Sequence, residues 1–212
     1  MGRQETGSRK AGLWVVAVWL MTMGAPACAA QTGPAVAVVR HFQDTLIAVM
    51  KAGKPLGFKG RYAKLLPAVR GSHDLSFIAQ LTLGPYWGKL APASRQAFVH
   101  AFTQLTVATY AAQFRRYSGQ AFHQSAAQAT AQGGVLVETE LMTRGRKDAT
   151  IDYLLAPAAG RWQIVNIVAN GVSDLALKRA QYTAIMRKKG FASLLAVLRD
   201  KVAQLSHGAL KG

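Results

Sequence analysis

The sequence predicts an α+β fold, with N-terminal helices, a four-stranded antiparallel meander and two C-terminal helices. Three observations support this prediction. Apolar residues recur with the helical period from about residue 34 to 117, alternate with a period of two from about 135 to 168, and return to the helical period after 174. Of the 212 residues, 50% are apolar and 17% are charged, which is typical of a globular chain and excludes collagen-like and low-complexity proteins.

Residues 1–29 have the pattern of a secretory signal peptide, and residues 30–212 are expected to form a single domain. Basic residues precede an uncharged run from Ala11 to Met23, and Ala27-Cys28-Ala29 fits the small-x-small site that signal peptidase cleaves. The run is too short to span a bilayer, which requires a helix of about 20 apolar residues. Cleavage would remove the one cysteine of the chain, so neither a disulfide nor thiol chemistry is expected in the exported protein.

The first expected helix begins near residue 34. Val39, Phe42 and Leu46 recur at spacings of three and four, which predicts an apolar stripe along one face. Gly53 and Pro55 are expected to end this helix, because both residue types interrupt helices.

Two shorter helical segments and one long helix are expected next. Residues 61–67 are predicted to form a short helical turn, and Asp74 to cap a helix that runs to Gly84-Pro85. The long helix begins at Pro92, where a first turn tolerates proline, and is expected to end near Tyr117. Apolar residues occupy two of its faces, which is typical of a helix buried between two layers.

Four strands are expected at residues 121–129, 135–142, 150–155 and 162–168. Short turns separate them, so neighbouring strands should pair antiparallel. Glu138 and Glu140 project from the same side of the second strand. Such a pair could perform glycosidic chemistry, but the alternation favours a solvated outer face.

The C-terminal zone is expected to hold two helices. Asp174 is predicted to cap the first, Gly190 to end it after Lys189, and an apolar stripe to run along the second from Phe191 to Leu205. Helices on both sides of a meander complete the α+β pattern.

The sequence carries no recognisable catalytic, metal or cofactor motif. None of the five histidines has a second histidine three or four residues away, the spacing that places two metal ligands on one helical face. A G-x-S-x-G elbow and a glycine-rich phosphate loop are also missing from the sequence. We therefore expect a protein that is not an enzyme and that uses neither a metal nor a cofactor. A hydrolase with a scattered triad is the weakest alternative.

Lys and Arg number 26 against 9 acids, which gives a formal net charge of +17. Basic clusters lie at Arg144, Arg146 and Lys147 and at Arg187-Lys188-Lys189. Nucleic acid is not an expected partner, because an exported protein seldom meets it. Anionic phospholipid headgroups or an acidic docking surface are better candidates. A charge that only keeps the protein soluble is the alternative.

The apolar side chains of the long helix and the strands admit two interpretations. They fill a solid core, or they line a cavity for an apolar ligand if the helices stand off the sheet. Periodicity does not separate these cases, because both bury the same side chains. The residues predicted to line such a cavity are Phe98, Phe102, Leu105, Tyr110, Val137, Leu141, Tyr153, Trp162 and Ile164.

Several segments occur in an order that resembles one known family. Residues 61–67 (RYAKLLP) fit the pattern R-Y-x-x-L-x-P. Further segments are 74–79, 83–87, 98–110 with Phe114, 117–119, 153–155, 161–165, 171–173 and 187–191 with Leu194, Leu195 and Leu198. Together they resemble the periplasmic lipid-carrier family of the toluene-tolerance proteins and the phospholipid carrier of the Mla pathway. Residues 106–111 look closest to the branch associated with hopanoid biosynthesis clusters.

Two positions depart from the pattern of this family. Asn166 stands where the family usually has Asp, and His73 stands where an aromatic residue is more usual.

The resemblance implies a soluble periplasmic carrier that encloses lipid acyl chains in an apolar cavity between helices and a twisted antiparallel sheet. It also implies exchange of phospholipid or hopanoid with an inner-membrane ABC transporter complex and an outer-membrane lipoprotein complex. The basic clusters are then expected to hold an anionic headgroup or to dock on acidic partners. The alternative is a periplasmic protein-binding or scaffold module with a solid core and no lipid cargo.

Overall fold

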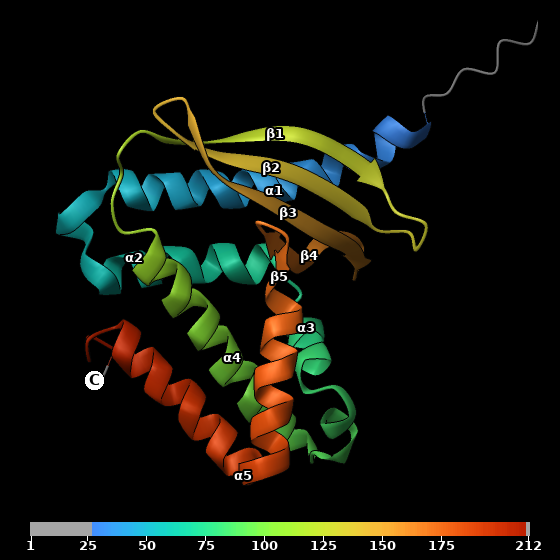
Figure 1. The fold of residues 1–212 in the computed structure, drawn as a ribbon, viewed down its shortest axis with the longest axis vertical. Helices are drawn as coiled ribbons and strands as arrows, with labels where there is room; N and C mark the ends of the chain where they lie inside the picture. Colours follow the sequence, from blue (N-terminus) through green and yellow to red (C-terminus); the bar gives the residue numbers. More distant parts are fainter. Residues whose placement is uncertain (1–26, 211–212) are drawn as a thin grey trace, which may run out of the picture.

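Helices precede and follow a single antiparallel sheet in the computed structural model, which describes residues 27–210 (Figure 1). This α+β arrangement is the predicted one. In chain order the elements are α1 (Ala27–Lys51), α2 (Gly53–Ser72), α3 (Leu75–Leu83), the 3-10 helix η1 (Gly84–Lys89), α4 (Pro92–Gln113), β1 (Gln120–Ala129), β2 (Val135–Thr143), β3 (Arg146–Ala158), β4 (Arg161–Ala169), β5 (Val172–Ser173) and α5 (Asp174–Leu205).

The strands lie in sequence order, β1-β2-β3-β4-β5, and each neighbouring pair is antiparallel. Tight turns produce this order. At the β2–β3 turn, Arg144 (φ 50°) and Gly145 (φ 80°) both adopt positive φ, as a type I′ hairpin turn requires. The register shifts once within each of the three long strand pairs, and such irregularities strengthen the twist of a sheet. Figure 1 shows the resulting curved sheet.

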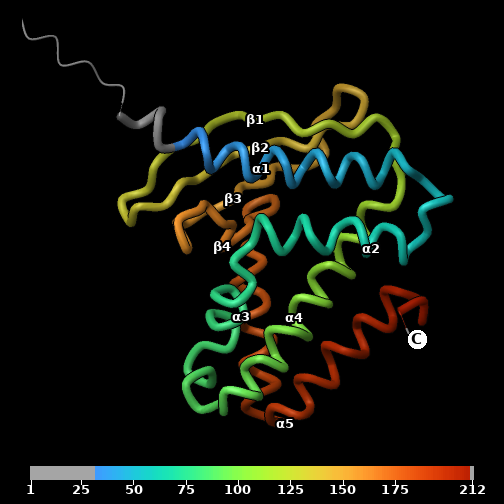
Figure 2. The backbone as a smooth tube through the Cα atoms, turned by 180° about the vertical axis from the view of Figure 1, so that it is seen from behind, coloured from blue at the N-terminus to red at the C-terminus, as the bar shows by residue number. Residues whose placement is uncertain are grey.

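α1 runs along one face of the sheet (Figures 1 and 2). Val39, Phe42 and Leu46 are at most 1% exposed, which confirms the predicted stripe. The helix ends at Lys51, and Gly53 follows with φ 65°. Gln43 is the polar exception on this buried face: its Nε2 donates to Thr139 Oγ1 at 3.2 Å, so a polar side chain is satisfied inside the layer.

α2 and α4 pack together beneath α1, and the buried Arg61 joins them. Its Nε donates to the carbonyl of Ala111 at 2.7 Å, near the C-terminal end of α4. A cation there also interacts favourably with the helix dipole. Burial, and to a lesser extent the charge of Arg115, lower the pKa of Arg61. The arginine of the R-Y-x-x-L-x-P pattern therefore has a structural role in joining two helices.

α5 bends at Gly190, whose φ of 78° and ψ of −179° are almost restricted to glycine. The predicted stop at Gly190 thus divides α5 into a first arm (174–189) and a second arm (191–205). Figure 1 shows that the two arms diverge from the bend as a V, with the open end toward the sheet.

Three helix predictions were wrong in detail. Residues 61–67 belong to the longer part of α2, which follows a break at Gly57 (φ 58°, ψ −175°) and runs to Ser72. This part includes Pro67, because burial of Leu65 and Val69 outweighs the local cost of proline. The long helix ends at Gln113 rather than near Tyr117. The N-cap of α5 is Ser173 rather than Asp174: Ser173 Oγ accepts from the backbone N–H of Ala176 at 3.1 Å.

A fifth strand adds to the four that were predicted. β5 has two residues and pairs with β4 through Val168 and Ser173, and it is too short to show an alternating pattern in the sequence. The predicted cap at Asp74 is confirmed, since its Oδ1 accepts from the backbone N–H of Phe77 at 2.9 Å. Residues 1–26 of the predicted signal peptide lie outside the described residues. From residue 27 to 210, no helix has the length and hydropathy needed to cross a membrane.

Candidate functional site

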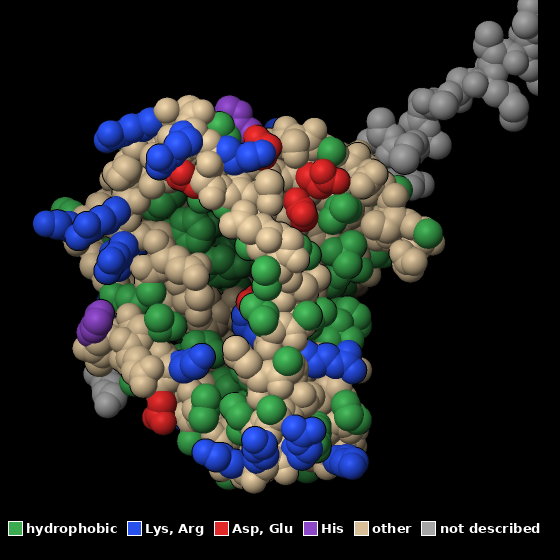
Figure 3. Space-filling view, in the orientation of Figure 1, with side chains coloured by type: hydrophobic (Ala, Val, Ile, Leu, Met, Phe, Trp, Pro, Cys, Tyr) green, Lys and Arg blue, Asp and Glu red, His purple; other side chains and the backbone are tan. Residues whose placement is uncertain are grey.

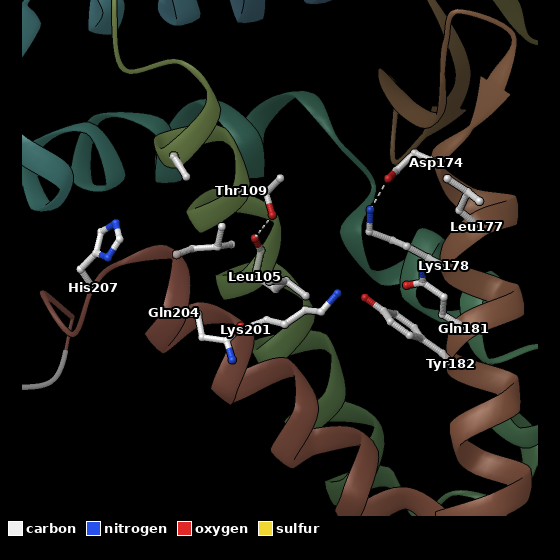
Figure 4. Close-up of a pocket in the computed structure, with 12 residues that line it drawn as sticks. Leu105, Thr109, Asp174, Leu177, Lys178, Gln181, Tyr182, Lys201, Gln204 and His207 are labelled. Carbon is white, nitrogen blue, oxygen red and sulfur yellow. Dashed lines mark hydrogen bonds and ion pairs between the residues drawn. The ribbon is translucent and has the colours of Figure 1, made fainter.

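A hollow lined with apolar side chains opens between the sheet and the helices below it (Figure 3). Its central part, about 570 Å³, lies between α4 and the two arms of α5 (Figure 4). We call the whole hollow the front groove. The central part is lined by Leu105, Thr109 and Ala112 of α4, by Asp174, Leu177, Lys178, Gln181 and Tyr182 of the first arm, and by Lys201, Gln204, Leu205 and His207.

Two further spaces continue the front groove. An inner chamber of about 210 Å³ lies against β3 and β4 and shares Thr109, Asp174 and Lys178 with the central part. A lower chamber of about 300 Å³ lies nearer the bend of α5 and shares Tyr182 and Lys201 with it. Because these walls are shared, the three spaces form one elongated groove.

The threonines of α4 keep their hydroxyl protons within the helix. Thr106 Oγ1 donates to the carbonyl of Phe102 at 2.9 Å, and Thr109 Oγ1 donates to that of Leu105 at 2.8 Å (Figure 4). Back-bonding of this kind satisfies a hydroxyl without an external partner. An apolar ligand therefore does not have to desolvate the hydroxyl groups of Thr106 and Thr109.

Aromatic and aliphatic side chains dominate the wall of the inner chamber. Tyr110 of α4 and Phe114, the residue that follows α4, pack at 6.1 Å between ring centroids, and Tyr153 of β3 faces the same space. Burial raises the pKa of Tyr110 well above its usual value and that of Tyr153 to about 12. Both phenols therefore stay neutral, and the chamber beside the sheet suits a hydrocarbon better than a charged group.

Charged groups lie where the inner chamber meets the central part. Lys178 Nζ and Asp174 Oδ1 form an ion pair one helical turn apart on the first arm of α5. The Lys178 side chain is 21% exposed, so its ammonium group lies at the edge of the solvent. Figure 4 shows Lys201 extending from the second arm toward Tyr182 on the first. The groove thus combines a mainly apolar inner chamber with an ion pair on the first arm and a further ammonium group, that of Lys201, on the second.

The MlaC protein family has a sequence profile that matches residues 40–200. This chain belongs to the MlaC family. The match covers most of the chain and confirms the resemblance in the sequence to the Mla-related carriers. No branch within the MlaC family is distinguished by this match, so the hopanoid-associated branch stays a prediction.

A solved structure shares the MlaC-family fold seen here. It is a phospholipid-binding protein from Ralstonia solanacearum in complex with a phospholipid. The two structures superpose with a TM-score of 0.71 at 21% sequence identity, over 81% of this chain and 98% of the other. At this identity the likeness concerns the fold.

Three of the predicted lining residues border the front groove. Leu105 lines the central part and the lower chamber, and Tyr110 and Tyr153 line the inner chamber. They come from α4 and β3, two elements that the sequence predicted to face each other. The structure thus brings together part of the predicted set.

The other predicted lining residues lie elsewhere. Phe98 and Val137 are at most 1% exposed and belong to the packed core. Phe102 and Ile164 line a small space of about 20 Å³ that adjoins the inner chamber and shares Tyr110 with it. Two further residues, Leu141 of β2 and Trp162 of β4, are half-buried in the sheet.

Residues of α5 form much of the groove and were not predicted as lining. Leu177 is 50% exposed, and Lys178, Gln181 and Lys201 are polar, so their pattern is that of a surface helix. The usable signal was the Gly190 break between two amphipathic segments, which allows both segments to border one space.

The two predicted basic clusters lie far apart, and their charges are balanced differently. Arg146 and Lys147, at the β2–β3 turn, pair with Asp148 at 3.7 Å and with Glu140 at 2.9 Å. The predicted outer face of β2 therefore carries an ion pair. Arg144 Nε donates to the carbonyl of Ser118 at 3.1 Å. Arg187, Lys188 and Lys189 precede the bend of α5 and are exposed, and among the described residues they form no ion pair.

The two residues that depart from the family pattern, His73 and Asn166, both contact neighbouring side chains. His73, where an aromatic residue is more usual, packs edge-on against Phe42 at 4.9 Å between ring centroids and lies 6.0 Å from the Tyr110 ring. Asn166 Oδ1 accepts from Ser173 Oγ at 3.1 Å, next to the first turn of α5. The imidazole of His73 thus packs as an aromatic ring would, and the amide of Asn166 supports the N-terminus of α5.

Across residues 32–210, no group of three or more His, Cys, Asp or Glu side chains is arranged to hold a metal ion. The groove geometry is that of a binding site for an elongated, mostly apolar ligand with a polar end.

Proposed function

We propose that this protein is a periplasmic lipid carrier without catalytic activity. It would take one lipid at a time into the front groove and carry it through the aqueous space between the inner and outer membranes. The observation that supports this proposal most strongly is the elongated groove, mainly apolar beside the sheet and bordered by the Asp174–Lys178 pair and by Lys201, in a member of the MlaC family. A relative of the same fold was solved with a phospholipid, which adds support for a lipid ligand.

A carrier of this kind has a clear physical task. Each methylene group exposed to water costs about 0.8 kcal/mol, so an acyl chain of about 16 carbons costs roughly 13 kcal/mol outside a membrane. That cost prevents spontaneous escape at a useful rate. A groove that replaces water around the chain removes most of the cost.

The groove assigns separate parts of the ligand to separate surfaces. The acyl chains would lie in the inner chamber and central part, against Leu105, Tyr110 and Tyr153. The headgroup would lie toward Lys201, whose ammonium group suits a phosphate and which, unlike Lys178, forms no ion pair among the described residues. We retain both phospholipid and hopanoid as cargo, since both present a large apolar surface.

The partners in this proposal are an inner-membrane ABC transporter complex and an outer-membrane lipoprotein complex. The exposed cluster Arg187-Lys188-Lys189 is the better docking candidate of the two basic clusters, because its charges are not paired among the described residues. Arg144, Arg146 and Lys147 would contribute less, since acids and a carbonyl already hold them. Export through the predicted signal peptide, residues 1–29, would place the protein between these partners.

The test is to purify the full chain from bacterial periplasm, extract it with organic solvent and measure lipid per chain by mass spectrometry. Thr109→Trp places a large ring at the boundary of inner chamber and central part, and is expected to reduce bound lipid at least fivefold. Thr183→Trp is the matched control, because Thr183 also bonds within its helix, to the carbonyl of Arg179 at 2.7 Å. A clean extract from the unmodified protein, with no uptake from liposomes, would favour the scaffold alternative.

A further inference from the structure

A second concave region lies on a different side of α4 from the front groove. It has a volume of about 630 Å³ and lies between the end of α2, the start of α3, η1, α4 and the start of β4. Figure 2 shows these elements from behind, with the α2–α3 junction close to β4. We call it the rear cleft. Its lining residues are Arg70, His73, Asp74, Leu75, Ser76, Trp87, Arg95, Gln96, Val99, His100, Thr103, Arg161 and Gln163.

The floor of the rear cleft is held in place by β4. The backbone N–H of Asp74 donates to the carbonyl of Ile164 at 3.0 Å, and Gln163 Nε2 donates to the carbonyl of His73 at 3.3 Å. Gln163 is 6% exposed and His73 is 4% exposed. The junction of α2 and α3 is therefore a fixed platform rather than a free loop.

Three guanidinium groups border this platform from three different elements. Arg70 lies on α2 one turn before His73, and Arg161 lies on β4 on the same face as Gln163, two residues away. Arg95 of α4 is held by η1: its Nε donates to the carbonyl of Trp87 at 3.1 Å, and its guanidinium lies 5.6 Å from the centre of the Trp87 ring.

Positive charge exceeds negative charge among the residues that line the rear cleft. Asp74 is the one acid among its lining residues, and its Oδ1 already accepts from the backbone of Phe77. Arg70 and Arg161 form no ion pair among the described residues. His73 adds no charge at neutral pH, because burial lowers its pKa to about 4. The rear cleft therefore has three guanidinium groups and a single carboxylate, one oxygen of which already accepts a hydrogen bond.

The rear cleft is separated from the front groove. The space between them is only about 20 Å³. His73 borders it on the side of the rear cleft and Tyr110 on the side of the inner chamber. Tyr110 OH lies 3.4 Å from His73 Nε2. An acyl chain cannot pass through so small a gap, so a ligand of the rear cleft arrives from the solvent and not from the groove.

We propose that the rear cleft is a second binding site, distinct from the lipid groove, for a ligand that carries a phosphate group. The planar forks of Arg70 and Arg161 match phosphate oxygens, and the fixed Arg95 supplies a third cation. The phosphate belongs to a soluble phosphate ester or to a lipid headgroup that the cleft meets at a membrane surface. This site does not depend on whether the front groove holds lipid.

The experiment titrates the full chain by calorimetry with glycerol 3-phosphate and with inorganic phosphate, at constant ionic strength set by chloride. The double variant Arg70→Gln/Arg161→Gln is expected to weaken binding at least tenfold. The control Arg115→Gln/Arg116→Gln removes two exposed guanidinium groups from the loop between α4 and β1, outside the cleft, and is expected to change binding less than twofold. Far-ultraviolet circular dichroism checks that both variants are folded.

A parallel arm measures co-sedimentation with vesicles of phosphatidylcholine containing phosphatidic acid. Saturable binding of glycerol 3-phosphate that requires Arg70 and Arg161 supports the site with a soluble ester as its ligand. Vesicle binding that requires both arginines, without binding of the soluble ester, supports the site with a lipid headgroup as its ligand. Equal weakening by both double variants, or no saturable binding in either arm, overturns the proposal. Lipid extracted from Arg70→Gln/Arg161→Gln should match the unmodified protein, so this test and that of the carrier function fail independently.

Discussion

Phe98 and Leu105 lie two turns apart on α4, yet one is part of a solid core and the other borders a groove. Phe98 is fully buried, with Phe102 and Tyr182 rings about 6 Å away. Leu105 lines two parts of the front groove. The difference follows from α5, whose arms converge at the bend and diverge toward the sheet (Figure 1). Beside Phe98 the ring of Tyr182 from the first arm fills the space, whereas beside Leu105 the two arms leave it hollow.

This contrast shows what amphipathic patterning does and does not determine. Both residues follow the same apolar pattern, and both are shielded from bulk solvent. Whether the shielded space is filled depends on the angle between two helical arms, and that angle is set by the backbone of one residue, Gly190. The following substitutions separate the two kinds of region.

The largest expected loss of stability is in the packed core around Phe98. Phe98→Ala should lower the free energy of unfolding by about 3–5 kcal/mol, because the deleted ring leaves a cavity among packed neighbours. Leu105→Ala, at the groove, should cost about 2 kcal/mol or less, since part of its surroundings is already empty. Urea unfolding followed by circular dichroism measures both. Equal losses would contradict the distinction between core and groove.

The bend of α5 is the next most sensitive point. Gly190→Ala introduces a side chain where φ is 78° and ψ is −179°, which costs about 1–3 kcal/mol. If α5 instead straightens to avoid this strain, the V opens and lipid retention falls. Thermal unfolding and lipid per chain should therefore both decrease. Gly88→Ala, at a glycine without positive φ and with open space for a Cβ, is the control and should change neither by a comparable amount.

His73 makes the free energy of unfolding sensitive to pH. Its pKa is about 4 in the folded protein, below the ordinary value of 6.5. The unfolded chain therefore binds the proton first, so the stability due to neutral His73 is complete above pH 6.5 and is lost as the pH falls toward 4. Between pH 7 and pH 4.5, the protein should lose about 2 kcal/mol more than His73→Phe, which cannot titrate. Urea titrations at both pH values measure this difference, and equal losses would show that His73 is not a buried neutral group.

The smallest effect on stability is expected at the groove itself. Thr109→Trp should change the free energy of unfolding by less than about 1 kcal/mol, since the new side chain enters existing space and removes one internal hydroxyl bond. A loss comparable to that of Phe98→Ala, seen in the same urea experiment, would indicate that this space is filled in solution.

Much of the fold could be predicted from local signals. The stripe of Val39, Phe42 and Leu46, the cap at Asp74 and the break at Gly190 each appear in the structure where the sequence placed them. Each depends on a few neighbouring residues and on backbone geometry. β5 was missed because two residues carry no period.

The site could be predicted only in part. Tyr110 and Tyr153 were identified because strands and the long helix had to face each other. Lys178 and Lys201 were not predicted as lining residues. A lysine on a helix is normally expected to be exposed to solvent, and the sequence does not give the direction of the second arm. Phe98 was assigned to the cavity because patterning does not distinguish filled from hollow space.

The most direct test of the account uses a phospholipid with a photoreactive diazirine near the end of one acyl chain. The protein is loaded from liposomes, irradiated and digested, and the cross-linked peptides are identified by mass spectrometry. The account predicts cross-links in the peptides that contain Tyr110 and Tyr153, with loss of both in Thr109→Trp. Cross-links confined to the exposed face of α1 or to the β2–β3 turn, and unchanged in that variant, would contradict the claim that the front groove encloses the acyl chains.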